Sequence, residues 1–182
     1  ARDRGVSPQE YAYDTLLEQG GQQLIFVPVA SYSECNLDIL HEQLSHSRTT
    51  ASLSDGGAHV ASICDASFTT FMLTHWVKGR TRGDRLALEE VIRKQTSEPA
   101  AIYALHDRGI LAVGKKADIN IIDLDALRLH APYTVFDLPT GGKRMLQKVD
   151  GFRFTLVSGE VIVQDGEMTE AMPGRLLRGP QH

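Results

Sequence analysis

The sequence has few cysteines, no long apolar run and no large excess of either charge. Its two cysteines, Cys35 and Cys64, lie far apart without metal-motif spacing, which favours a reduced, cytoplasmic protein. No apolar stretch is long enough to span a bilayer, and the start A-R-D-R-G-V-S-P lacks a signal-peptide core. The net charge of −4 provides no basic surface for nucleic acid. We therefore expect a globular protein with neither a membrane nor a nucleic-acid partner.

The length and composition are those of an ordinary globular chain. The 182 residues allow one domain or parts of two, and 42% of them are hydrophobic and 23% charged. Residue 1 is Ala rather than Met, and a helix start follows within a few residues. We expect this sequence to be a piece of a longer protein.

The first third of the chain alternates between helical and strand patterns. Ser7-Pro8-Gln9-Glu10 is a capping box, and the helix that it starts ends at Gly20-Gly21. The apolar run 24–29 predicts a strand buried on both faces, 36–44 predicts a helix, and 49–54 predicts a second strand. This alternation favours a parallel sheet or barrel.

The remainder changes from helices to short strands. Further helices are predicted at 68–78, 88–95 and 97–105. From Ile110 the apolar period becomes two, which predicts strands at 119–123, 145–149, 152–157 and 161–164. Asp150-Gly151 is typical of a hairpin turn, and so is Asp165-Gly166. We therefore divide the chain into an α/β part, 1–109, and an antiparallel part, 110–182, which is typical of a portion of a small β-sandwich.

Chemistry is concentrated in the stretch T-T-A-S-L-S-D-G-G-A-H, residues 49–59. The predicted strand delivers Asp55 to its C-terminal end, where α/β barrels place catalytic groups. Gly56 and Gly57 allow a sharp turn and close approach to a ligand, and His59 follows. The same letters are also ordinary turn chemistry, so the local sequence leaves both interpretations open.

Five motifs, in order, resemble the amidohydrolase superfamily, and among its members the N-acyl-D-amino-acid deacylases. They are S-L-S-D-G-G-A-H, R-K-Q-T-S-E-P-A, H-D-R-G-I-L-A-V-G-K-K-A-D-I-N-I-I-D, V-S-G-E-V-I-V-Q-D-G and P-G-R-L-L-R-G. The resemblance implies the C-terminal part of a metal-dependent (β/α)8 barrel together with part of a small antiparallel β-sandwich. The remainder of the parent chain would then be a partner, and an oligomer is possible.

The resemblance also implies a reaction, the hydrolysis of a small N-acyl amino acid. A divalent metal, usually zinc, polarises a water molecule, and a carboxylate at the end of the last barrel strand accepts its proton. Asp55 matches that carboxylate and is also the one candidate metal ligand. By the same resemblance His59, Gly56 and Gly57 would contact the substrate.

The family's His-x-His metal pair is absent from this sequence. His41 and His46 lie on or just after a predicted helix, and we interpret them as surface residues rather than ligands. We expect this chain to lack most metal ligands, which leaves a non-catalytic fragment or assembly module as an alternative. A related cyclic-amide hydrolase or deaminase is another.

A basic run, Lys78, Arg80 and Arg82, follows one predicted helix. It is open to two interpretations, contact with a substrate carboxylate or a solvated helix end.

Overall fold

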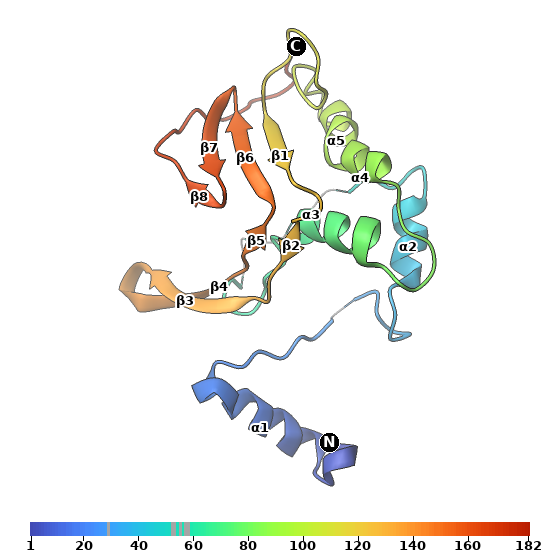
Figure 1. The fold of residues 1–182 in the computed structure, drawn as a ribbon, viewed down its shortest axis with the longest axis vertical. Coiled ribbons are helices and arrows are strands. Elements are labelled where there is room, and N and C mark those ends of the chain that lie inside the picture. The colour runs from blue at the N-terminus through green and yellow to red at the C-terminus, as the bar shows by residue number, and fades with distance from the viewer. Residues whose placement is uncertain (29, 52–53, 55, 57–58) are drawn as a thin grey trace.

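The computed structural model describes residues 1–28, 30–51, 54, 56 and 59–182 (Figure 1). The helices are η1 (Arg2–Arg4), α1 (Pro8–Gly21), α2 (Asp38–Ser45), α3 (Phe68–Phe71), η2 (Met72–Gly79), α4 (Leu88–Gln95), α5 (Ser97–Ile102) and η3 (Pro139–Gly141). The strands are β1 (Ile119–Ile122), β2 (Arg128–Leu129), β3 (Tyr133–Leu138), β4 (Gly142–Leu146), β5 (Val149–Asp150), β6 (Phe152–Val157), β7 (Glu160–Gln164) and β8 (Glu167–Met168). No helix in this described part has the length and apolar character needed to cross a membrane.

The first helix begins as its capping box predicts. The Ser7 hydroxyl accepts a hydrogen bond from the Glu10 amide at 3.1 Å, and Pro8 occupies the first turn. The backbone leaves helical geometry at Glu18 to Gly20, near the predicted end. Helix α1 buries no residue and projects away from the rest of the molecule (Figure 1).

The strand predicted at 24–29 is wrong wherever it is described. Residues 24–28 have no regular secondary structure, and the side chain of Phe26 is 86% exposed. Residues 49–51 and 54 of the second predicted strand are likewise outside any strand, and the rest of it lies outside the described residues. A central parallel strand needs hydrogen-bonding neighbours on both sides. Here, every described pairing between named strands is antiparallel.

The C-terminal part is antiparallel β structure, as predicted. One sheet has the order β1-β6-β7-β8, and two smaller sheets pair β2 with β5 and β3 with β4. The Asp165-Gly166 turn joins β7 to β8 with both residues at positive φ, as its hairpin prediction requires. That these sheets belong to a sandwich stays a prediction.

The hairpin predicted at Asp150-Gly151 is wrong. The chain passes here from one sheet to another, since β5 pairs with β2 whereas β6 pairs with β1 and β7. Gly151 has φ 97°, and a Cβ on it would lie 2.6 Å from Leu127 Cα. The glycine therefore permits a close crossing of two backbones rather than a tight turn.

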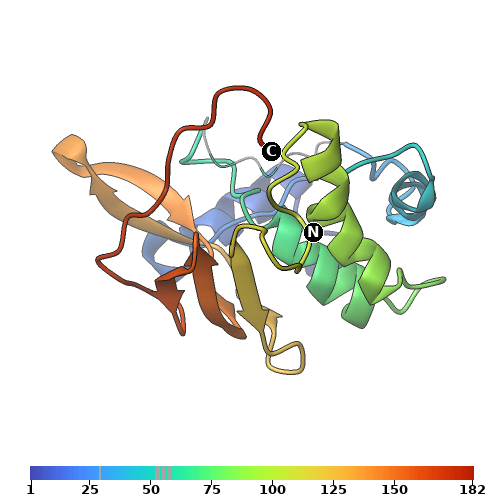
Figure 2. The same cartoon turned by 90° about the horizontal axis from the view of Figure 1, so that it is seen from above.

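One apolar core joins the helices to the strands. Its buried members are Met72, Leu73, Trp76, Leu86, Val91 and Leu127. Ile122, Val149 and Phe152 pack against it from the strands or their ends. Viewed from above, helices α3 to α5 lie beside the β1-β6-β7-β8 sheet (Figure 2). The core thus draws residues from both sides of position 109, where the sequence suggested a division into two parts.

The crossing at Gly151 predicts a position-specific loss of stability. Gly151→Ala places a Cβ against the Leu127 backbone at positive φ, whereas Gly166→Ala meets the same positive φ with no atom within 4 Å. We expect the control to cost about 1 kcal/mol of unfolding free energy. Gly151→Ala should cost about 2 kcal/mol more. Urea denaturation measures both, and equal losses would contradict the clash.

Candidate functional site

The loop that follows Ser54 is held against the start of α3. The Ser54 hydroxyl donates hydrogen bonds to the carbonyls of Asp65, at 3.2 Å, and Ala66. A Cβ on Gly56 would lie 3.1 Å from the Cβ of Ala66, tighter than most real contacts. The glycine therefore allows the loop to pack closely against Ala66, and the Ser54 hydrogen bonds hold the loop at the same residues.

The second half of the loop begins at His59, which is exposed and has φ 52°. The His59 carbonyl accepts hydrogen bonds from the amides of Ser62 at 2.7 Å and Ile63 at 2.9 Å, which close a tight turn. The Val60 carbonyl accepts one from the Met145 amide of β4 at 2.8 Å. Gly56 and His59 therefore belong to a loop docked on β4. The predicted residues Asp55 and Gly57 lie outside the described residues.

A pocket of about 360 Å³ lies beside this loop. The loop and α3 line one side of it, with Gly56, Cys64 and Thr70, and β4 lines the other with Arg144 and Met145. Gly56 thus borders a cavity large enough for a small molecule.

At this pocket, the charged side chain Arg144 is already paired, and the thiol of Cys64 is protonated. Nε and Nη2 of Arg144 each donate a hydrogen bond to the Asp137 carboxylate at 2.7 Å, and these bonds lower the pKa of Asp137. Burial, together with the nearby Asp65 charge, raises the pKa of the Cys64 thiol. Cys64 is therefore a protonated thiol near neutral pH and no nucleophile.

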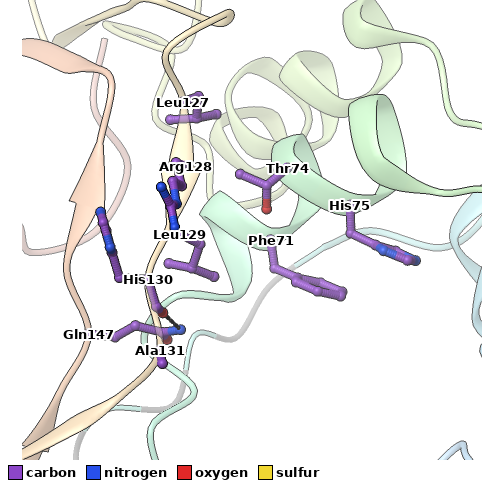
Figure 3. A pocket seen from close by; sticks show the side chains of 9 residues that line it. All are labelled: Phe71, Thr74, His75, Leu127, Arg128, Leu129, His130, Ala131 and Gln147. Carbon is purple, nitrogen blue, oxygen red and sulfur yellow. Dashed lines mark hydrogen bonds between the residues drawn. The ribbon is translucent and has the colours of Figure 1, made fainter.

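A second pocket, of about 500 Å³, opens between the α3–η2 helix, β2 with the residues that follow it, and Gln147 after β4 (Figure 3). His75 and Phe71 point away from Arg128 of β2 and from His130, which follows that strand (Figure 3). The His130 ring is already bonded to the Asp150 carboxylate at 2.7 Å. Since its polar groups do not converge, this pocket is a weaker candidate for chemistry than the one beside Gly56.

His75 is a half-buried histidine beside the core. Its ring stacks on Phe71 at 4.8 Å and meets Trp76 edge-on at 4.9 Å. Burial, and then the charge of Arg80, lower the pKa of His75. Its Nε2 is buried without a partner among the described residues.

The interpretation of the basic run as a solvated helix end holds for Arg82, which is 68% exposed, and fails for the buried Arg80. Arg80 is 5% exposed, lies over the Trp76 ring and donates to the Asp38 carboxylate at 2.7 Å. Arg82 donates to the same carboxylate at 2.8 Å, and the pair of arginines lowers the pKa of Asp38. Lys78 donates to the carbonyls of the β1–β2 connection. All three tie elements together.

The described residues do not fit a metal centre. They contain no group of three His, Cys, Asp or Glu side chains placed to hold an ion. His46 is exposed, as expected. His41 departs from the surface prediction, because its ring packs on Trp76 at 5.9 Å with a buried Nε2. No step of the reaction is therefore assigned to zinc here.

The strand predicted at 145–149 overlaps β4 at Met145 and Leu146, which line this pocket, but β3 and its pairing with β4 were not predicted. The signal was present. Tyr133-Thr134-Val135-Phe136 is a β-branched and aromatic run, and it is followed by a turn containing Gly141-Gly142.

The chain belongs to the amidohydrolase family, because the sequence model described as "Amidohydrolase family" matches residues 36–163. The match spans the loop, the pocket and most of the strands. No solved structure matches this chain significantly.

Three curated relatives match about half of the chain each. They are an N-acyl-D-glutamate deacylase of Alcaligenes xylosoxydans xylosoxydans (36% identity, 51% of this chain, 17% of the relative), an allantoinase of Solibacter usitatus (30%, 51%, 21%) and a dihydroorotase of Methanothermobacter thermautotrophicus (33%, 47%, 20%). The matched region spans about a fifth of the length of these relatives.

The small number of candidate metal ligands predicts weak metal binding by this chain alone. Catalytic zinc sites use about three protein ligands, whereas Asp55 is the single candidate in the sequence. After exhaustive dialysis, elemental analysis of residues 1–182 should find well under one zinc per chain. One tightly held zinc per chain would show that the histidines had been misjudged.

The environment of His75 predicts an acid-sensitive core. The unfolded imidazole, with a pKa of about 6.5, binds a proton at higher pH than the folded one does, so folding stability falls as pH drops below that value. His75→Phe should flatten the loss of stability between pH 7.5 and 5.5 measured by urea denaturation. His46→Phe, at an exposed site, should leave the slope unchanged. Identical slopes in both variants would contradict the prediction.

Proposed function

We propose that this chain is part of a hydrolase that cleaves the amide C–N bond of N-acyl amino acids, in the cytoplasm. The observation that carries the proposal is the family match across the anchored loop, where Gly56 borders a pocket of small-molecule size. The 36% identity to an N-acyl-D-glutamate deacylase supports the choice of a linear amide.

The proposed reaction assigns roles to residues of this loop. A water oxygen attacks the amide carbonyl carbon, and the C–N bond breaks to give a carboxylic acid and an amine. Asp55 accepts the proton of the water and passes it to the departing nitrogen. Gly56, which borders the pocket, would contact the substrate through its backbone, and the exposed His59 is available to bind polar groups of the substrate. A zinc cofactor would need ligands beyond the described residues.

Hydrolysis of a cyclic amide is the second candidate. The allantoinase and dihydroorotase have identities comparable to that of the deacylase, and so does an L-hydantoinase of Paenarthrobacter aurescens, at 35% over 52% of this chain. Opening a ring amide breaks the same type of bond and makes the same use of a proton acceptor. A third possibility, a non-catalytic assembly module, is favoured for the isolated 182 residues by the missing metal cluster among the described residues.

The role of Asp55 predicts a selective kinetic defect. In the full-length protein, Asp55→Asn keeps the size of the side chain but removes the base, so kcat should fall by about 10²–10⁴-fold with little change in KM. Steady-state kinetics on an N-acyl amino acid, beside a thermal melt, measures both activity and folding.

The chain supplies a matched control at another Asp-Gly pair. Asp165 stands before Gly166 in the β7–β8 turn and is exposed. Asp165→Asn should leave kcat unchanged. A normal kcat in Asp55→Asn, or a loss explained by unfolding, would make Asp55 an ordinary turn residue.

A further inference from the structure

A lysine is buried at the end of α4. Lys94 is 1% exposed, and its ammonium donates a hydrogen bond to the Thr49 carbonyl at 2.6 Å. The same helix is fixed in the core by Val91, which is 0% exposed. A lysine is rarely buried to this extent, because removing its charge from water is costly. An apolar side chain of similar length would fill the same space at lower cost.

The neighbouring residue holds the chain at a second place. Gln95 donates from its amide nitrogen to the Thr69 carbonyl at 2.9 Å. Consecutive helix residues point about 100° apart, so Lys94 and Gln95 reach in different directions from one helix turn. Their two acceptors flank the segment 50–68, which contains the candidate active-site loop.

We propose that Lys94 and Gln95 form a clamp that positions this loop for catalysis. The inference rests on the proposed function for its catalytic consequence. The ammonium makes a charge-assisted hydrogen bond at the entry of the segment, and such bonds are stronger than neutral ones. The side-chain amide of Gln95 makes the hydrogen bond at the end of the segment. Between them, the Ser54 hydroxyl donates to the Ala66 carbonyl and Gly56 packs closely against the Ala66 side chain, so the loop lies against Ala66 at residues 54 and 56.

The clamp explains why a charge is buried at this position. Catalytic groups work only within narrow limits of position, and a misplacement of about 1 Å can cost about 10²-fold in rate. Lys94 and Gln95 are thus positioning residues, which act through the backbone of the loop.

Three methionine variants of the full-length protein test the clamp. Lys94→Met and Gln95→Met remove one donor each while keeping an unbranched side chain. Lys78→Met is the matched control, since Lys78 also donates to backbone carbonyls, those of Leu124 and Asp125, away from the loop. Hydrogen exchange of peptides covering residues 59–68 reports on the loop, and peptides covering 119–122 of β1 serve as reference.

We expect both clamp variants to speed exchange in 59–68 by at least tenfold relative to β1, and Lys78→Met to leave this ratio unchanged. Their kcat should fall by about 10–10²-fold with KM within about threefold. If Lys94→Met fails to fold, Gln95→Met decides, because Gln95 is only half-buried.

The two proposals fail separately. Unchanged exchange in 59–68 in the folded clamp variants would overturn the clamp, whatever the activity. Faster exchange with normal kcat would overturn its catalytic role. The wild-type protein could hydrolyse no amide while hydrogen exchange in 59–68 is still faster in the clamp variants. That result would keep the clamp as a structural feature and overturn the proposed function.

Discussion

The packing of η2 and α4 into one apolar core is the interaction on which the rest of the structure depends. Trp76 and Val91 are almost completely buried there, and Leu127 brings the strands into contact with them. Burial of side chains of this size contributes about 1.5–3 kcal/mol each. Helix α4, fixed in this way, holds the carbonyls of Thr49 and Thr69, and β4 holds Val60. The position of the candidate loop therefore depends on the packing of the core.

Features with local causes were predictable from the sequence. The capping box at Ser7 gave the start of α1, and apolar spacing gave α2, the α3–η2 helix and α4, although not the π-helical geometry of η2. Runs of β-branched residues gave β1, β6 and β7. The turn chemistry of Asp165-Gly166 likewise identified its hairpin.

Features that depend on distant partners were not predictable. The apolar run 24–28 looks like a strand, but a strand exists only where neighbours accept its hydrogen bonds. Asp150-Gly151 is a dipeptide typical of hairpin turns. Glycine is required there, however, because the backbone of Leu127 passes too close to leave room for a Cβ. At the site, the structure places Gly56 beside a pocket, and the predicted strand 145–149 covers part of its β4 wall. The hairpin partner β3 was missed, and the roles of Asp55, Gly56, Gly57 and His59 stay predictions. The helical spacing of Leu88, Val91 and Lys94 would place Lys94 on the inward face of α4. A charged side chain, however, is normally expected at the surface.

The most direct test of the account is the hydrolysis of amides by the full-length, metal-replete protein. The substrates are N-acetyl-D-glutamate and its L form, set against dihydroorotate, allantoin and a hydantoin, with release of free amine or opening of the ring measured for each. We expect stoichiometric amine and carboxylic acid from an N-acyl amino acid, at a higher kcat/KM than for any ring. A folded protein that hydrolyses none of these amides would contradict the proposed hydrolase function.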